Sequence, residues 1–180
     1  VTHRKFTQSL SPPPPGGSAT HEFDSEVDMM VLTQGGIGWT RMIAPAHCQV
    51  RITSLQDQDA TRYFDTEMLA LTIKGGDLPA NMMIRESPSK ASTGRVSERG
   101  LVIESLMISS FFDVFTELTV DGGATWSPAG DSIPIALTYP TEYFFGSNRF
   151  PPNGSYANMP EDVISYPGNI ILRSVGVMRI

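Results

Sequence analysis

The stretch FDSEVDMMV, residues 23–31, carries the pattern that decides the fold. Apolar or small side chains occupy every second position from Phe23 to Val31, and acidic side chains fill most of the positions between them. A period of two is typical of a β-strand with one face buried and the other in water. The same alternation recurs in three further runs, at residues 48–52, 112–120 and 133–137. No stretch shows a helical period with caps, so the sequence predicts an all-β fold with little or no helix.

Glycine and proline punctuate these runs and indicate how the strands are joined. The chain holds 16 Gly and 14 Pro, and glycine pairs or Asn-Gly and Pro-Gly steps separate the predicted strands at the spacing of a sandwich. We therefore expect an antiparallel β-sandwich of the jelly-roll or Ig-like kind over residues 21–180. Residues 1–20 are expected to form an extended arm, with a strand-like start and the proline-rich spacer SPPPPGGSAT. Phe-Asp, Gly-Gly, Trp and Pro follow one another in the same order in residues 23–52 and in residues 112–137, which suggests an internal hairpin duplication.

Composition narrows the function classes. The net charge of −6 disfavours binding to nucleic acid or to anionic lipid, and no apolar run is long enough for membrane insertion. Because the first residue is Val rather than Met, we expect a processed chain or a fragment. Cys48 is the single cysteine, which excludes an internal disulfide. Its alternation with Val50 and Ile52 predicts that the thiol is buried and inert, with His47 on the outward face.

The segment TVDGGATW, residues 119–126, fits the Asp-box hairpin seen in sialidase-like propellers. In such a hairpin an Asp carboxylate accepts turn amides, glycine supplies a positive φ and the Trp packs over the turn. This resemblance implies a structural role and no catalytic one. A ligand-binding role for the Trp is the alternative. The predicted turn residues are Asp121, Gly122, Gly123, Thr125 and Trp126, with Trp39 at the equivalent place in the first hairpin.

The sequence offers no recognisable catalytic or cofactor machinery. It lacks a Gly-x-Ser-x-Gly elbow and a phosphate-binding Gly loop, and His3, His21 and His47 lie far apart. Acidic residues near strand starts could gather Ca²⁺ or form a glycosidase pair, but alternation places most of them on a solvated face. We therefore expect a protein that is not an enzyme and that uses no cofactor, with Ca²⁺ as the alternative.

Four segments resemble a group of secreted, β-rich bacterial repeat proteins. They are FDTEMLAL (residues 64–71), MIRESPSKASTG (83–94), SFFDVFTELTVDGGATWSP (110–128) and PPPPGGSATHEFDSEVD (12–28). The group has no assigned activity, so the resemblance implies an extracellular β-rich module. In such proteins a strand like residues 169–175 runs directly into one like residues 1–6. These pieces stand at opposite ends here, which could make the chain one period of an array.

The leading functional expectation is an extracellular structural subunit that self-assembles into a fibre, sheath or surface layer. Strand-like ends suit it, because an exposed strand can pair with a neighbouring copy by strand addition. The alternative is a carbohydrate- or ligand-binding module, with glycans as possible partners. The expected partners are otherwise copies of the chain itself. The residues expected at the assembly interface are Val1, His3, Phe6, Ile170, Leu172, Met178 and Ile180.

Overall fold

The computed structural model describes residues 1–33, 37–102, 105–138, 150, 154–159 and 161–174. These residues hold thirteen strands and no helix, as the all-β prediction requires. The first seven strands are β1 (Thr2–Arg4), β2 (Ser18–Leu32), β3 (Thr40–Ser54), β4 (Thr61–Lys74), β5 (Met83–Glu86), β6 (Ser92–Val102) and β7 (Ser105–Val114). The others are β8 (Thr116–Thr119), β9 (Ser127–Pro128), β10 (Ile133–Thr138), β11 (Ser155–Ala157), β12 (Val163–Tyr166) and β13 (Ile170–Ser174).

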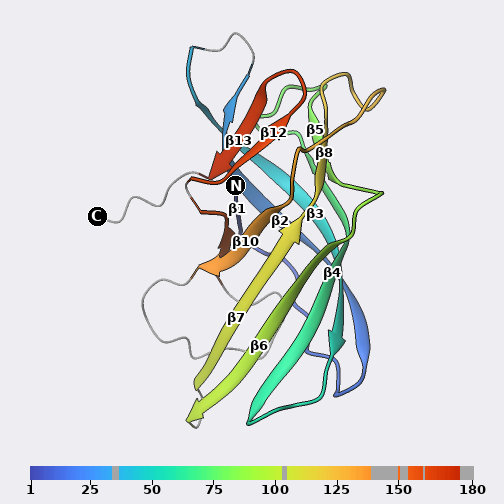
Figure 1. Cartoon of the computed structure of the whole chain (residues 1–180), viewed down its shortest axis with the longest axis vertical. Coiled ribbons are helices and arrows are strands. Elements are labelled where there is room, and N and C mark those ends of the chain that lie inside the picture. The colour runs from blue at the N-terminus through green and yellow to red at the C-terminus, as the bar shows by residue number, and fades with distance from the viewer. Residues whose placement is uncertain (34–36, 103–104, 139–149, 151–153, 160, 175–180) are drawn as a thin grey trace, which may run out of the picture.

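Eight of the strands close into an antiparallel barrel (Figure 1). Around the ring the order is β2, β3, β4, β6, β7, β10, β11 and β1, and β1 pairs again with β2. The short strand β1 completes the ring, because Thr2 pairs with Ala157 on one side and with Asp28 on the other. The predicted sandwich is therefore wrong in its architecture. A sandwich and a barrel both turn alternate residues inward, so alternation alone cannot separate them.

The first twenty residues do not form a detached arm. Strand β1 lies inside the barrel wall, and β2 begins at Ser18, within the predicted proline-rich spacer. Between them, Leu10 forms an isolated bridge with Phe150. The amide of Ser54 also donates to the carbonyl of Gly17, so the end of the spacer follows the body of the protein.

Two smaller groups of strands extend the barrel at one end (Figure 1). Strands β13 and β12 continue the sheet from the end of β2, through the pair Leu172 and Val31. Strands β5, β8 and β9 continue it from the end of β4. The Gly130 amide donates to the Ser165 carbonyl, and the hydroxyls of Thr116 and Tyr166 lie 2.6 Å apart, so the two groups meet above the barrel.

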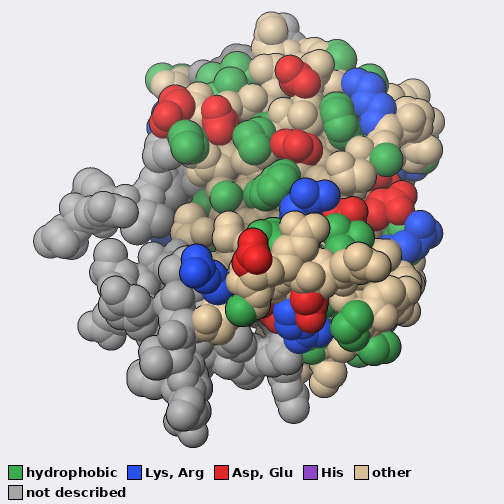
Figure 2. Space-filling view, turned by 60° about the horizontal axis from the view of Figure 1, so that its bottom comes forward, with side chains coloured by type: hydrophobic (Ala, Val, Ile, Leu, Met, Phe, Trp, Pro, Cys, Tyr) green, Lys and Arg blue, Asp and Glu red, His purple; other side chains and the backbone are tan. Residues whose placement is uncertain are grey.

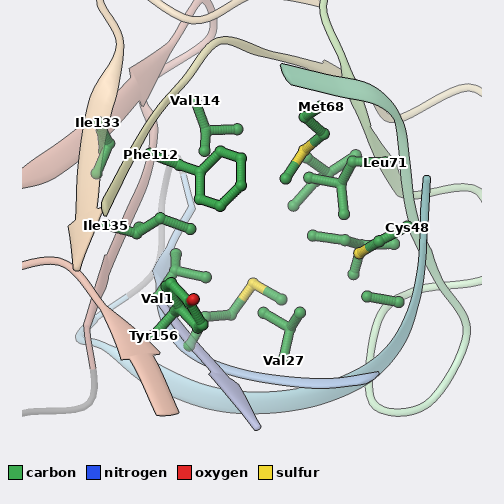
Figure 3. Packing of buried hydrophobic residues seen from close by; sticks show 14 of the residues in the cluster. Val1, Val27, Cys48, Met68, Leu71, Phe112, Val114, Ile133, Ile135 and Tyr156 are labelled. Carbon is green, nitrogen blue, oxygen red and sulfur yellow. The ribbon is translucent and has the colours of Figure 1, made fainter. Parts of the chain in front are cut away.

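A single apolar core fills the ring (Figure 3). The alternation of β2 is confirmed on its inward face, where Phe23, Val27, Met29 and Val31 are all buried. On the outward face Asp24 is exposed as predicted, but Asp28 is buried. Figure 3 shows side chains from strands on opposite sides of the ring pointing toward one another, with Cys48, Met68 and Leu71 facing Phe112, Val114 and Ile135. On the face seen in Figure 2, basic, acidic and hydrophobic side chains lie interspersed.

One glycine permits a close strand approach in the barrel wall. Gly94 pairs with Phe112 across β6 and β7, and a Cβ built on it would lie 2.1 Å from the carbonyl oxygen of Phe111. No side chain fits at that distance, so any substitution there would push the two strands apart. Tight approach at this point helps the wall to curve into a ring.

Candidate functional site

The interior of the barrel contains a cavity of about 50 Å³. Inward-facing residues of β2, β3, β4, β6, β7, β10 and β11 contribute to its wall, because their alternate side chains all point at the barrel axis. Its lining is almost wholly apolar, and the labelled residues Cys48, Met68, Phe112, Ile135 and Tyr156 can be followed in Figure 3. Other aromatic walls come from Phe6, Phe23 and Phe150.

Two polar atoms of the wall have no hydrogen-bond partner among the described residues. They are Nε2 of His21, on β2, and Oγ1 of Thr66, on β4. Both residues are buried, with 6% and 4% of their surfaces exposed. A buried polar atom without a partner costs about 1–3 kcal/mol, so most proteins avoid leaving one. Two such atoms on one cavity wall are therefore a specific feature of this interior.

The other polar groups of the wall are already engaged. The hydroxyl of Tyr156 donates to Oγ of Ser110 at 2.8 Å. Nδ1 of His3 lies 3.5 Å from Oγ of Ser25, and either atom could donate. These contacts leave Nε2 of His21 and Oγ1 of Thr66 as the polar side-chain atoms of the lining residues without a partner among the described residues.

The cavity is also electrically neutral. No Lys, Arg, Asp or Glu lines it among the described residues. Burial lowers the pKa of His21, and burial together with the nearby N-terminal amine lowers the pKa of His3 to about 4. Burial raises the pKa of the Cys48 thiol to about 12, so the thiol stays protonated. At neutral pH the wall thus presents neutral donors and acceptors on an apolar surface.

A second, smaller cavity of about 30 Å³ lies deeper, toward β12 and β13. His3 and Ile135 line both cavities and so stand between them. Its wall is also mainly apolar, with Val1, Met29 and Leu172 among its residues.

The outer face of the barrel carries a larger hollow of about 580 Å³ across β3, β4, β6 and β7. Its charged side chains form ion pairs with one another: Arg51 with Glu67 at 2.9 Å, and Arg95 with Asp65 at 2.8 Å. Phe111 adds an exposed ring at its edge. Because these charged groups already satisfy one another, the interior cavity is the stronger candidate site.

The predicted turn motif is built around one carboxylate. Asp121 accepts hydrogen bonds from the hydroxyl of Thr119 at 2.7 Å, the amide of Thr125 at 2.9 Å and the hydroxyl of Thr125 at 2.6 Å. These bonds hold its pKa well below the usual range, with the Thr119 hydroxyl contributing most. Gly122 and Gly123 have φ angles of 74° and 97°, which glycine adopts without strain. This geometry is that of a stapled turn.

Both tryptophans stack against an arginine. Cζ of Arg85 lies 3.9 Å from the ring of Trp126, and Cζ of Arg173 lies 4.1 Å from the ring of Trp39. Each indole is half-buried and lies outside the interior cavity. The structure does not bring the turn motif and the cavity together.

The residues predicted at an assembly interface pack within their own chain where the structure describes them. Val1, His3 and Leu172 are buried, and Phe6 and Ile170 pack against the core. Phe6 makes edge contacts with the rings of Phe23 and Tyr156, at 5.6 and 5.9 Å. The predictions for Met178 and Ile180 lie outside the described residues.

The sequence interpretation missed His21 and Thr66 as site residues. The signal was present, because His21 precedes Phe23 by two positions and so shares its buried face, and Thr66 stands two positions after Phe64. What the sequence could not show is that strands β2 and β4 turn these faces toward one cavity.

The described residues contain no group of three or more His, Cys, Asp or Glu side chains arranged to hold a metal ion. The described residues include no helix that is long and apolar enough to cross a membrane. Comparison of the chain with protein-family models, with curated proteins and with solved structures gives no match.

Proposed function

We propose that this protein binds a small, mainly apolar molecule inside its barrel and has no catalytic role. The observation that carries the proposal is the interior cavity of about 50 Å³ with its almost wholly apolar wall. Eight strands give a barrel whose interior is either filled by side chains or holds one small ligand. A small ligand in the cavity would fill this space and add apolar contacts with its wall.

The size of the cavity limits both the ligand and its affinity. A water molecule needs roughly 10–15 Å³ measured in this way, so the cavity takes a molecule of about three to five non-hydrogen atoms. Small ligands gain at most about 1.5 kcal/mol per non-hydrogen atom, so a dissociation constant tighter than micromolar is not expected.

The test is a titration of the isotope-labelled protein with 1-chlorobutane, followed by NMR. We expect saturable shifts in the methyl resonances of cavity residues such as Met68 and Ile135. The variant Val50→Leu fills part of the cavity and should weaken binding at least tenfold. Val163→Leu makes the same exchange at an exposed site outside the cavity and should leave binding unchanged. Shifts that never saturate, or that persist in Val50→Leu, would refute the proposal.

A second candidate function is self-assembly of an extracellular structural subunit. It is favoured by exposed apolar side chains on and before the edge strand β12: 46% of Val163, on this strand, and 65% of Met159, in the segment that precedes it, are accessible. Strand β12 ends the sheet order, and an edge strand can add a strand from a neighbouring copy. Sedimentation velocity of the wild type and of Val163→Lys tests this candidate. A wild type that remains monomeric at high concentration would exclude it.

A further inference from the structure

We propose that the hollow on the outer face of the barrel is a second binding site, and that it takes a neutral oligosaccharide. The hollow crosses β3, β4, β6 and β7 and has a volume of about 580 Å³. This volume lies within the range of about 300–1,000 Å³ for pockets that bind small molecules. Because alternate residues of a barrel strand point inward and outward, its outward side chains belong to a different surface from the lining of the interior cavity. The inference therefore does not depend on the proposed function.

The floor of the hollow is a continuous surface of side chains from paired strands. These side chains form two neighbouring rows, with Thr53, Asp65, Arg95 and Phe111 in the first and Arg51, Glu67 and Thr93 in the second. Directly opposite residues point to the same face, with Cβ atoms about 4.5–5.5 Å apart, so neighbouring members of a row can contact the same ligand. The first row crosses three strand spacings of about 4.8 Å each, so the hollow is longer than one sugar ring and suits a chain of them.

Ion pairs hold the charged side chains of this floor in place without using up their hydrogen-bonding capacity. Nη1 of Arg51 lies 2.9 Å from Oε2 of Glu67, and the four charged side chains are between 39% and 54% exposed. Nε and Nη2 of Arg95 lie 2.9 and 2.8 Å from Oδ1 of Asp65. Among the described residues each pair thus engages one oxygen of its carboxylate, which leaves the other oxygen and several N–H groups for a ligand. Sugar hydroxyls both donate and accept, so they can bond to both kinds of group.

The charge balance of the floor and its exposed ring select the class of ligand. The charges of the two arginines and the two carboxylates sum to zero, so a charged ligand would be repelled by one half of the floor as much as it is attracted by the other. Phe111 is 44% exposed and lies opposite Arg95, at one end of the first row. The face of an aromatic ring is apolar and carries negative partial charge, so the C–H groups on one side of a sugar ring can pack against it. A neutral oligosaccharide combines this C–H face with hydroxyls for the ion pairs.

The experiment is a binding screen at pH 7 against immobilised tetrasaccharides of neutral hexoses, of uronic acids and of glucosamine. We expect the wild type to bind at least one neutral tetrasaccharide saturably, and Phe111→Ala to weaken that binding at least tenfold. Phe111→Tyr keeps the ring and should retain binding, which separates loss of the ring from loss of the fold. Val163→Ala shortens an apolar side chain of similar exposure outside the hollow and should leave binding unchanged.

Two further variants test the charge balance and the location of the site. Asp65→Asn combined with Glu67→Gln keeps the shape of the floor but leaves both arginines without a counter-charge. This double variant should shift the preference at least tenfold from the neutral toward the uronic-acid tetrasaccharides. Val50→Leu fills part of the interior cavity and should leave the binding of the neutral tetrasaccharide unchanged.

Several results would overturn the inference. A wild type that binds none of the neutral tetrasaccharides, or binds only the charged ones, would contradict the choice of ligand. Binding that is unchanged in Phe111→Ala, or that is lost in Val50→Leu, would place the ligand outside the hollow. Binding that is lost in Trp126→Ala but not in Phe111→Ala would move the site to the turn motif. None of these results would affect the proposed function, which is tested by 1-chlorobutane in the interior cavity.

Discussion

Replacing Thr66 by Val should stabilise the ligand-free protein. The hydroxyl of Thr66 is buried, with 4% of the residue exposed, and has no partner among the described residues. Such a group costs about 1–3 kcal/mol, and Val keeps the shape of the side chain while removing that cost. We expect the free energy of unfolding to rise by about 1 kcal/mol, which corresponds to a gain of about 2–4 °C in Tm for a chain of this size.

The same exchange at Thr119 is the matched control and should act in the opposite direction. Thr119 is equally buried, at 2% exposure, but its hydroxyl donates to Asp121 and accepts from the amide of Gly123 at 3.0 Å. A hydrogen bond to a charged group is worth about 1.5–3 kcal/mol. Thr119→Val should therefore lose about 2 kcal/mol.

Urea denaturation followed by tryptophan fluorescence measures both variants, with the m-value as a check that the unfolding reaction is unchanged. Both variants replace a buried threonine hydroxyl by a methyl group. We expect Thr66→Val to raise the free energy of unfolding and Thr119→Val to lower it. If Thr66→Val loses as much stability as Thr119→Val, the Thr66 hydroxyl is hydrogen-bonded in the native protein. The Thr66 hydroxyl would then not be an unpartnered group of the cavity wall.

Three further predictions concern other parts of the molecule. Asp28 is 3% exposed and accepts hydrogen bonds from Arg41, which lower the pKa of its carboxyl group below 3.8. The ionised carboxylate therefore contributes its full stabilisation of the fold above pH 3.8, and this contribution is lost as the pH falls below that value. Asp28→Asn should thus cost about 1–2 kcal/mol at pH 7, since Arg41 is half exposed, and less at pH 2; an equal cost at both values would contradict the ion-pair explanation. Cys48 should react with a thiol reagent at pH 8 only as fast as the protein opens, because burial raises its pKa to about 12, and rapid labelling of the native protein would show an accessible thiol. Trp126→Ala should lose about 1–2 kcal/mol in urea titration, less than a fully buried aromatic, because the indole is half-buried and stacks on Arg85; a loss above 3 kcal/mol would mean that its packing is deeper.

The strand pattern of β2 and β3 could be predicted from the sequence because one face of each strand is buried along its whole length. Phe23, Cys48 and Ile52 are buried as expected, and His47 is exposed. The alternation predicted from Phe112 to Val120 is right for the first half and wrong for the second. Strands β7 and β8 are separated at Phe115, and beyond this break the four residues of β8 are all buried.

The break at Phe115 explains why burial was predicted wrongly at the end of the run from Phe112 to Val120. Val120 was expected on the core face and is 49% exposed, whereas Thr119 was expected outside and is 2% exposed. Tyr166 of β12 contacts Thr116 on one face of β8, and Arg85 pairs with Glu117 on the other, so both faces are covered. A period of two describes only a strand with one wet face. Burial of both faces depends on which segments, distant in the sequence, pack against the strand, and the local sequence does not contain that information.

The candidate site was harder to predict than the fold for a related reason. His21 and Thr66 are isolated polar residues in apolar-faced strands, and neither belongs to a motif with fixed spacing. They share one face of the β2, β3 and β4 sheet, and that face lines a cavity only because the ring closes. Closure itself depends on a three-residue strand whose sequence, Thr-His-Arg, carries no strong pattern.

That small closing strand governs the order of events when the chain folds. The pairing of Thr2 with Ala157 joins segments from nearly opposite ends of the chain, so the ring cannot close until the segment near Ala157 has been synthesised. Contacts between such distant segments carry a large loop-closure cost and are associated with folding in milliseconds to seconds. Until then β1 and β11 each lack one neighbour, and the interior is open to water along that seam. The slowest step of folding should therefore be the sealing of this seam, and the cavity comes into existence only when the seam is sealed.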